Sequence, residues 1–432
     1  MARLETLADA ERYLDGFVNQ ERAVSFDYER FGLARIRALL DRIGNPERQL
    51  PCIHITGSKG KGTTALASEA LLIASGLRTG TYTSPHLESW RERFRIDGSW
   101  VEEQRLVSVL GSMLPALEEL RRDRELAPSF FDVSTGLALA LFRDAGVDAA
   151  VIEVGLGGRI DSTNVVASRV SVLTAVQLEH TETLGETREL IAREKVGIAR
   201  PGMPFLHGPL SPDAHGVVAA RAVIDDFLLE EVRAFDVVPA PRGLRFVTGS
   251  GTQVEAGILG EHQAVNLALA IRAVEHFLQK TLTRRELEVL RSLRLPARIE
   301  VFPGFAEGAV LDCAHTPDSA RALRRALAQA WPDRRLVLLV SLARDKDAAG
   351  FFAELAGDTR ACVLTRAEPT RSAPPEELEP FARAAGIECI ETDELPVAAL
   401  KRALGLLQPG ELLVITGSMY LAGVLRTRLA AG

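Results

Sequence analysis

A glycine-rich segment at residues 56–64, TGSKGKGTT, contains the residue types that bind phosphate groups. It lies between a run rich in β-branched residues at 52–56 and an apolar stretch at 63–75, which indicates a strand, a loop and a helix. Glycines let backbone N–H groups approach a phosphate, and the start of a helix adds partial positive charge. Lys61 would neutralise phosphate, and the Thr63 hydroxyl can hold Mg²⁺. The segment therefore favours a nucleoside triphosphate as the ligand.

Two other interpretations of this segment stay open. It departs from the standard phosphate-binding loop because Ile55 occupies the first glycine position and Gly62 follows the lysine. Gly60, Gly62 and Ala65 fit the dinucleotide pattern G-x-G-x-x-G/A. That pattern also needs an acidic residue about 20 positions later, but the strand expected at 79–83 runs into TSPH without a carboxylate. A purely structural turn is the third interpretation.

Metal-type side chains follow two later apolar runs. Glu153 ends the strand expected at 149–154 and precedes glycines, and His180 follows the strand expected at 170–176. Open parallel sheets bind ligands at the carboxyl ends of their strands, so Glu153 should lie near a nucleotide on the first loop. A surface carboxylate is the weaker interpretation of Glu153. His180 alone is ambiguous, and Lys195 alone fits the solvated face of a helix.

Polar residues also follow strands in the last third of the chain. Asp312 and His315 lie in DCAHTP, residues 341–347 follow a second apolar run, and Ser418 follows a third. We expect this second domain to close on the nucleotide of the first, with the active site in the cleft between them.

The elements that position these residues alternate between strands and helices, which predicts an α/β fold. We expect a P-loop-type nucleotide-binding domain with a mostly parallel sheet over residues 1–295. A smaller Rossmann-like α/β domain should follow over 296–432, with RLPARIE at 294–300 as the linker. Short strand-like pieces and turns are expected within 222–260.

Composition sets outer limits on function. The chain has 432 residues, is 47% hydrophobic and carries a net charge of −7, so it can bury a sizeable core and no general basic surface for nucleic acid is expected. No apolar run approaches the ~18 residues of a membrane span, and charges interrupt the N-terminus, so no membrane partner is expected either. Four separated cysteines suit buried thiols in a reducing compartment. We therefore expect a cytoplasmic enzyme, acting as a monomer.

Taken in order over nearly the whole chain, these segments resemble the folylpolyglutamate synthase/dihydrofolate synthase family of the Mur ligase superfamily. The motifs are FGL..I..LL...GNP, TGSKGKGTT, YTSPHL with RERFRI, EVGLGGRIDSTN, EHTETLG, IAREKVGIARPGMP, GEHQAVN, PARIE, DCAHTP, ARDKD and TGSMYLAG. The resemblance implies an ATP-dependent ligase that joins a folate-type carboxylate to the amine of L-glutamate through an acyl phosphate.

The resemblance also implies roles for individual residues. It assigns ATP binding to Gly57, Ser58, Lys59, Gly60, Lys61, Gly62, Thr63, Thr64, Asn266, Arg298 and Asp312. Two Mg²⁺ sites are implied, one helped by Thr63 and one held by Ser84, Glu153 and His180. Lys61, Lys195 (carbamylated in the family) and His315 are implied catalytic residues, and Asp161 and Ser418 lie on the folate and glutamate sides.

Several positions depart from the family pattern. Ser58, Lys59 and Glu179 replace the usual threonine, asparagine and aspartate, and Asp132 stands where glutamate is frequent. Ser162 replaces an alanine and Thr316 an asparagine, which leaves the acid and amino-acid substrates open. A Mur-type ligase with another acid or amino acid, or an ATP-binding protein without turnover, are therefore the alternatives.

Overall fold

The computed structural model describes residues 4–19, 32–240, 243–305 and 308–431. The chain divides into two compact units. The first comprises Met1–Phe235, Val247–Val254 and Gln263–Leu290, and the second comprises Asp236–Phe246, Glu255–His262 and Arg291–Gly432. No helix in the described ranges is long and apolar enough to cross a membrane.

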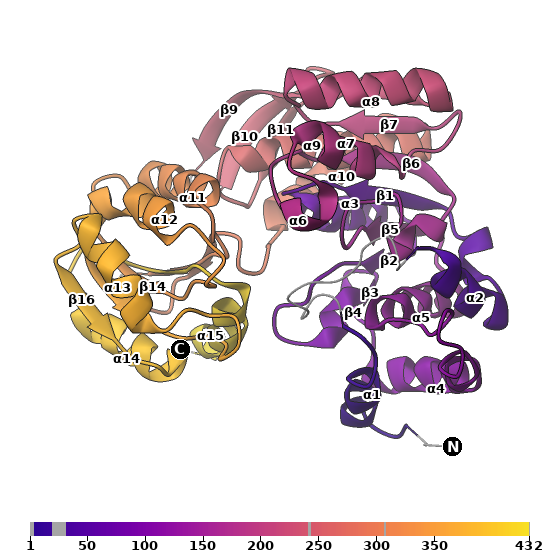
Figure 1. The fold of residues 1–432 in the computed structure, drawn as a ribbon. Helices are drawn as coiled ribbons and strands as arrows, with labels where there is room; N and C mark the ends of the chain where they lie inside the picture. Colours follow the sequence, from indigo (N-terminus) through magenta and orange to yellow (C-terminus); the bar gives the residue numbers. More distant parts are fainter. Residues whose placement is uncertain (1–3, 20–31, 241–242, 306–307, 432) are drawn as a thin grey trace. The chain divides into compact units, whose positions relative to one another are not determined.

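The first unit is built on a sheet whose described strands have the order β4-β3-β2-β5-β1-β6-β7-β8 (Figure 1). β1 lies at its centre, parallel to both β5 and β6. Among the described strands of this sheet, only β3 runs in the opposite direction, since it is antiparallel to both β2 and β4. β1 and β5 are buried along their whole length, as expected for parallel strands covered on both faces. The strands are β1 Cys52–Thr56, β2 Thr79–Tyr82, β3 Phe94–Ile96, β4 Ser99–Trp100, β5 Ala149–Glu153, β6 Ser168–Leu173, β7 Pro204–His207 and β8 Leu228–Glu231.

Helices alternate with these strands, which confirms the predicted mostly parallel α/β sheet. The helix expected at 63–75 begins two residues earlier, at Lys61. Of the helical pattern predicted for residues 1–50, positions 20–31 lie outside the described residues. The helices are α1 Leu7–Leu14, α2 Ala34–Arg42, α3 Lys61–Ala74, α4 Glu103–Leu120, α5 Phe130–Ala145, α6 Thr181–Leu184, α7 Arg188–Val196, α8 Pro212–Asp225, α9 His262–Leu278 and α10 Arg284–Leu287.

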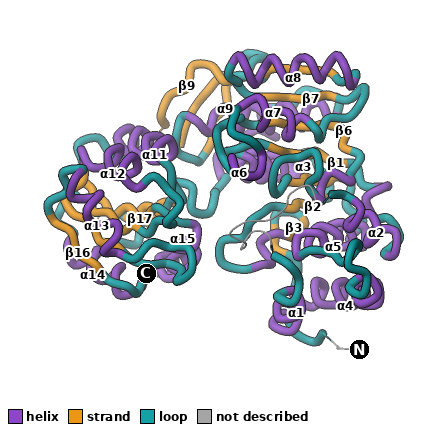
Figure 2. The backbone as a smooth tube through the Cα atoms, viewed as in Figure 1, coloured by secondary structure: helices purple, strands orange, loops and turns teal. Residues whose placement is uncertain are grey.

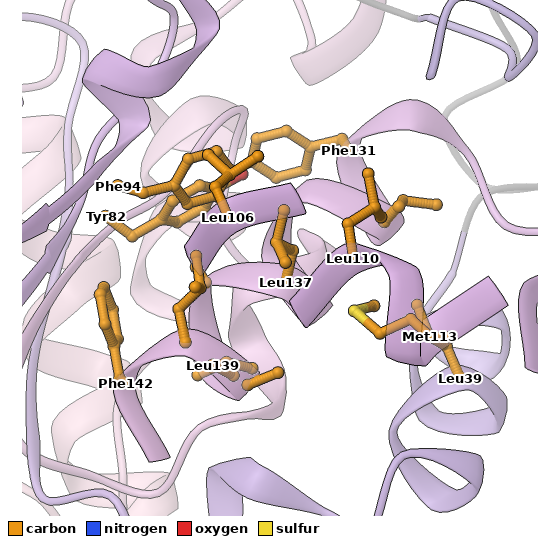
Figure 3. Packing of buried hydrophobic residues seen from close by; sticks show 14 of the residues in the cluster. Leu39, Tyr82, Phe94, Leu106, Leu110, Met113, Phe131, Leu137, Leu139 and Phe142 are labelled. Carbon is orange, nitrogen blue, oxygen red and sulfur yellow. The ribbon is translucent and has the colours of Figure 1, made fainter. Parts of the chain in front are cut away.

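One large apolar cluster joins α2, α4 and α5 to strands β2 and β3 (Figure 3). Tyr82 stacks on Phe94 with ring centroids 5.8 Å apart, and Leu137 of α5 is fully buried within the cluster. Ser129 begins α5 with a capping box to Asp132, and Gly146 ends it in the left-handed conformation. This packing fixes the position of the α5 N-terminus, which contacts the candidate site.

The second unit contains a smaller sheet with the order β12-β13-β17-β14-β15-β16, in which only β12 of the described strands is antiparallel. Figure 2 shows strands of this sheet, with β16 and β17 labelled, in orange among purple helices. This confirms the second, smaller α/β sheet domain. The strands are β12 Glu300–Phe302, β13 Ala309–Leu311, β14 Leu336–Val340, β15 Thr359–Leu364, β16 Cys389–Thr392 and β17 Leu412–Thr416. The helices are α11 Pro317–Ala330, α12 Ala348–Leu355, α13 Pro375–Ala384, α14 Pro396–Leu406 and α15 Met419–Ala431.

The region expected to contain short strands and turns forms a three-stranded sheet with the order β11-β10-β9. Its strands are β9 Ala234–Ala240, β10 Gly243–Thr248 and β11 Gln253–Ala256. Short 3₁₀ helices complete the described elements: η2 Pro46–Gln49, η3 Trp90–Arg93, η4 Ser162–Val165, η5 Glu288–Ser292 and η6 Ala356–Asp358. All four cysteines are free thiols.

Candidate functional site

The glycine-rich loop connects β1 to α3 at the centre of the first sheet, and two of its glycines are required by geometry. Gly57 has φ +146°, and a Cβ there would lie 1.9 Å from Oγ1 of Thr174. Gly60 caps α3 with φ +90°, and its Cβ would lie 2.2 Å from Oδ1 of Asn266. Only glycine fits at either position, because L side chains meet both a strained backbone and a hard contact.

The segment after β6 holds this loop in place. The Thr174 hydroxyl donates to the carbonyl of Lys59 at 2.6 Å. Ser58 donates its hydroxyl to the Gln177 carbonyl at 3.2 Å and accepts from the Gln177 N–H at 3.0 Å. Ser58 and Lys59 therefore both take part in the hydrogen bonds that join the loop to the segment after β6. Sequence reasoning missed Thr174, although it lies within the strand expected at 170–176, and it had placed Gln177 directly after that strand.

Lys61 begins α3 and donates from Nζ to the carbonyl of Gly57 at 2.9 Å, which folds its ammonium back over the loop. Thr63 and Thr64 are buried in the first turn, and the Thr64 hydroxyl donates to the backbone carbonyl of Asn266 at 3.3 Å. The amide of Asn266 in turn donates to Oε1 of Gln263 at 2.9 Å. The loop, the helix N-terminus and α9 therefore form one cradle with a lysine beside it, an arrangement that suits a phosphate group.

Ser84 and Glu153 lie together beside this cradle. The Ser84 N–H donates to Oε2 of Glu153 at 3.2 Å, and the same oxygen would lie 3.8 Å from a Cβ on Gly62. Both side chains are buried, as is Thr63. Carboxylate and hydroxyl oxygens are hard donors, so Glu153 with Ser84 fits one Mg²⁺, and the Thr63 hydroxyl suits another.

His180 is placed differently from these three residues. It is exposed and caps α6 with φ +47°. The part of the chain that the structure describes holds no cluster of three or more His, Cys, Asp or Glu residues arranged for a metal ion. The structure therefore brings Ser84, Glu153 and the loop together, whereas His180 lies on the neighbouring strand connection.

Lys195 of α7 is 2% exposed and pairs with Glu179 at 3.2 Å. Burial lowers the pKa of Lys195 to about 8 against the opposing effect of Glu179. Burial works in the other direction on Glu179, yet Lys195, Lys61, Lys59 and His180 together lower the pKa of its carboxyl. The interpretation of Lys195 as a solvated surface residue is therefore wrong, since it belongs to a buried charge cluster next to the phosphate loop.

Asp161 caps η4, and its carboxylate accepts hydrogen bonds from within its own segment. Oδ2 accepts from the N–H of Leu156 at 2.9 Å, and Oδ1 accepts from the N–H of Thr163 at 2.9 Å. Burial raises the pKa of Asp161 to about 6. The carboxylate thus joins the two ends of the loop between Leu156 and Thr163, which follows β5.

In the second unit, Asp312 follows β13 and organises the backbone around it. Its Oδ2 accepts from the N–H of Ile299 at 2.9 Å, and Oδ1 accepts from the N–H of Ala314 at 2.7 Å. Burial raises the pKa of Asp312, opposed by the positive charges of Arg298 and His262. Arg298 and Asp312 are therefore electrostatic neighbours, and His262 is a member of the cluster that sequence reasoning missed.

His315 and Ser418 follow β13 and β17, which are adjacent parallel strands. The Nδ1 of His315 lies 2.7 Å from the Cys313 carbonyl, which can only accept, so Nδ1 carries the proton. The Ser418 hydroxyl accepts from the Tyr420 N–H at 3.1 Å at the start of α15. Both residues thus occupy the same edge of the second sheet.

Comparisons with known proteins point to one family. Residues 297–419 match the family described as Mur ligase, glutamate ligase domain. The folylpolyglutamate synthase of Lacticaseibacillus casei is 36% identical over 414 residues, covering 92% of this chain and 94% of that protein. The dihydrofolate synthase/folylpolyglutamate synthase of Mycobacterium tuberculosis is 32% identical, covering 91% of this chain and 89% of that protein.

Solved structures extend the similarity to the fold. The Mycobacterium tuberculosis folylpolyglutamate synthase complexed with ADP and AMPPCP has a TM-score of 0.89 and 32% identity, covering 98% of each chain. The E. coli FolC structure in complex with DHPP and ADP has a TM-score of 0.83 and 25% identity, covering 100% of this chain and 99% of that one. Sequence, fold and the phosphate-loop geometry agree, and the chain belongs to the folylpolyglutamate synthase/dihydrofolate synthase family.

Proposed function

We propose that this enzyme is an ATP-dependent ligase that adds L-glutamate to a folate-type carboxylate, that of dihydropteroate, tetrahydrofolate or both. The observation that carries the proposal is the Lys61 loop at the start of α3 with Glu153 and Ser84 beside it. A pure nucleotide-binding module needs no buried carboxylate or lysine cluster next to its phosphate loop. The relatives named as folylpolyglutamate and dihydrofolate synthases support the same chemistry.

The first unit would supply phosphate binding and metal ligands. Backbone N–H groups of the loop and Lys61 would hold the β- and γ-phosphates, since phosphoryl transfer depends mainly on positioning and charge neutralisation. Thr63 would help hold one Mg²⁺, and Ser84, Glu153 and His180 a second. Bound Mg²⁺ would neutralise the charge that develops on the transferred phosphoryl group.

The reaction would proceed in two steps. The folate carboxylate attacks the γ-phosphorus of ATP, which forms an acyl phosphate and releases ADP. The amine of glutamate then attacks the acyl carbon, which forms the amide and releases phosphate. We assign nucleotide contacts to Asn266, Arg298 and Asp312, folate contacts to the segment of Asp161, and the glutamate side to His315 and Ser418. Residues 1–295 would act as the ATP-binding domain and 296–432 as the glutamate-ligase domain.

Lys195 would act as a carbamate. Carbamylation requires the neutral amine, and the burial that lowers the pKa of Lys195 to about 8 increases that fraction at neutral pH. The carbamate would add an anionic oxygen beside the metal ligands. Protein equilibrated with ¹³C-bicarbonate should show a carbamate carbonyl signal by NMR, absent in Lys195→Met; equal spectra of both proteins would refute this role.

Purified enzyme with ATP, Mg²⁺ and L-glutamate tests the whole proposal. Products from dihydropteroate and from tetrahydrofolate, separated by mass spectrometry, should gain one or more glutamyl units with release of ADP. A product with another amino acid or acid in a substrate panel would establish the Mur-type alternative, and nucleotide binding without any product would establish a non-turnover protein. We also propose that the enzyme works as a cytoplasmic monomer. Size-exclusion chromatography with light scattering tests the oligomeric state.

A further inference from the structure

Three consecutive polar residues, Asp161, Ser162 and Thr163, are buried at the start of η4. Ser162 donates its hydroxyl to Oδ1 of Asp132 in the first turn of α5 at 2.7 Å. Thr163 contacts His54, a fully buried residue in the middle of β1. Side chains therefore fasten this short segment to the core on both of its sides.

A series of hydrogen bonds runs from His54 through Thr163 to Asp161, and the donor and acceptor of each one can be assigned. The Thr163 hydroxyl donates to Oδ1 of Asp161 at 2.5 Å, because an ionised carboxylate can only accept. Its oxygen then accepts from Nε2 of His54 at 2.9 Å. His54 is consequently the Nε2–H tautomer, and its Nδ1 has no hydrogen-bond partner among the described residues. Burial lowers the pKa of His54 to about 3, which keeps the ring neutral.

Asp161 connects this series of hydrogen bonds to the backbone of residues 156–163. Its two oxygens accept from the N–H groups of Leu156 and Thr163, so the carboxylate closes the loop between them. Because both oxygens of the Asp161 carboxylate accept backbone hydrogen bonds, the carboxylate fixes the conformation of this loop. The position of Asp161 in turn depends on Thr163 and His54.

β1 thus supports two functional segments at once. The Thr56 hydroxyl, two residues after His54, donates to the carbonyl of Gly157 at 2.7 Å. Residues two apart on a strand point to the same face, so Thr56 and His54 fasten the two ends of the 157–163 segment. Thr56 also begins the phosphate loop, which places both segments on one rigid, fully buried strand.

We propose that His54 is a positioning residue that acts through Thr163 and Asp161 to hold the 155–164 segment in the shape that binds the folate-type acceptor. The proposal rests on the proposed function for the identity of the acceptor. His54 is fully buried in β1, and its Nε2 bonds to Thr163. Its effect falls on acceptor binding because this series of hydrogen bonds ends in the 155–164 segment.

Steady-state kinetics of two pairs of variants test this role. His54→Leu and Thr163→Val each break the relay, which is the pair of hydrogen bonds His54–Thr163 and Thr163–Asp161, at nearly constant side-chain volume. Each variant should raise the KM for the folate acceptor about tenfold and leave the KM for MgATP within about twofold of the wild-type value. His54→Gln, whose amide can replace the Nε2–H donor, and Thr163→Ser should recover most of the acceptor affinity. The double variant His54→Leu/Thr163→Val should be no worse than either single one, because both break the same chain.

Ser171→Ala is the matched control. Ser171 lies beside His54 in the β1–β6 register, is buried, and donates its hydroxyl to the Ile198 carbonyl at 3.0 Å. This variant loses a buried hydrogen bond in the same sheet and should leave the acceptor KM unchanged. An equal rise of the acceptor and MgATP KM values, or no recovery in His54→Gln and Thr163→Ser, would overturn the positioning role.

Hydrogen exchange separates this inference from the proposed function. Amides of residues 155–164 should exchange at least tenfold faster in His54→Leu and Thr163→Val than in wild type, with no change in Ser171→Ala. This result is independent of turnover, so wild-type protein inactive with every folate would refute only the proposed function. Unchanged exchange in both variants would refute the relay itself; if His54→Leu fails to fold, Thr163→Val still decides the question.

Discussion

Lys61 is the side chain on which the proposed phosphate chemistry depends most directly. Its ammonium lies over the loop, bonded to the Gly57 carbonyl, where it can turn to a bound phosphate. We predict that Lys61→Ala lowers kcat/KM for MgATP by about 100-fold or more, the range seen when one preorganised charge is removed. Lys280→Ala removes an exposed lysine paired with Glu286 and should retain activity in the same ADP-release assay. Equal activity of both variants would exclude the phosphate role of Lys61.

Asp161 should also leave a signature in the pH dependence of stability. Its pKa in the folded protein is about 6 against an ordinary value of 3.8, so the folded state binds the proton more tightly than the unfolded state. Stability from this group is therefore present below about pH 4 and is lost as the pH rises to about 6. The rise in pKa from 3.8 to about 6 corresponds to about 3 kcal/mol of unfolding free energy.

We predict that the unfolding free energy of wild type falls relative to Asp161→Asn by a few kcal/mol between pH 4 and 6 and then stays constant. Urea unfolding followed by tryptophan fluorescence in a Trp331→Phe background reports on Trp90 and Trp100 of the first unit. A constant difference between the two proteins over this pH range would contradict a raised pKa at Asp161.

The residues found from sequence are those whose chemistry is unusual for their surroundings. Glu153 and Asp312 are charged groups at the ends of apolar strands, and Lys61 lies in a glycine-rich loop that follows one, so these patterns can be recognised in the sequence alone. His54 and Thr163 were not predictable in the same way, because a histidine and a threonine in apolar or polar runs have many roles. Their role follows from a hydrogen bond between residues 109 positions apart.

The phosphate loop works as an element because its glycines let the backbone pass close to β6 and α9. Gly57→Ala would place a Cβ 1.9 Å from the Thr174 hydroxyl, so either Thr174 or the loop must move. We predict that this variant weakens MgATP binding at least tenfold, measured by isothermal titration calorimetry. The change acts through loop shape alone, since no charge is lost.

Gly76→Ala is the control for this prediction. Gly76 follows the other end of α3, has φ +86°, and a Cβ there meets nothing within 4 Å. It should cost about 1–2 kcal/mol of stability through backbone strain and leave nucleotide affinity unchanged. Similar affinity losses in both variants would mean that the loop is sensitive to stability in general and not to the contact with Thr174.

Elements were predictable where one pattern dominated the local sequence. β1, β5 and β14 are short apolar runs buried on both faces, and their bounds follow closely from the sequence. The small antiparallel strands β3 and β4 were not predicted, because three and two residues carry too little periodicity. Their positions are set by pairing, because β3 pairs with β2 and β4 pairs with β3.

The whole molecule carries a net charge of −7 and yet must collect several anionic ligands. Its long-range field therefore opposes ATP and folate, and local lysines must overcome it near the loop. Lys59 is half-buried and close enough to Glu179 and Lys195 to lower the pKa values of both. It adds a positive charge where the family resemblance predicts asparagine.

We predict that Lys59→Asn raises the KM for MgATP about fivefold at 20 mM salt, with kcat nearly unchanged, because one attractive charge near the phosphates is lost. The difference from wild type should shrink to within twofold at 500 mM salt, because the screening length there is below about 5 Å and charges farther apart than this are largely screened. Lys401→Asn is the control, since it changes the net charge of the molecule equally from an exposed position on α14. If both variants raised the KM to the same extent, the global charge would control ATP capture; an effect confined to Lys59→Asn means that a local charge outweighs the acidic field of the whole molecule.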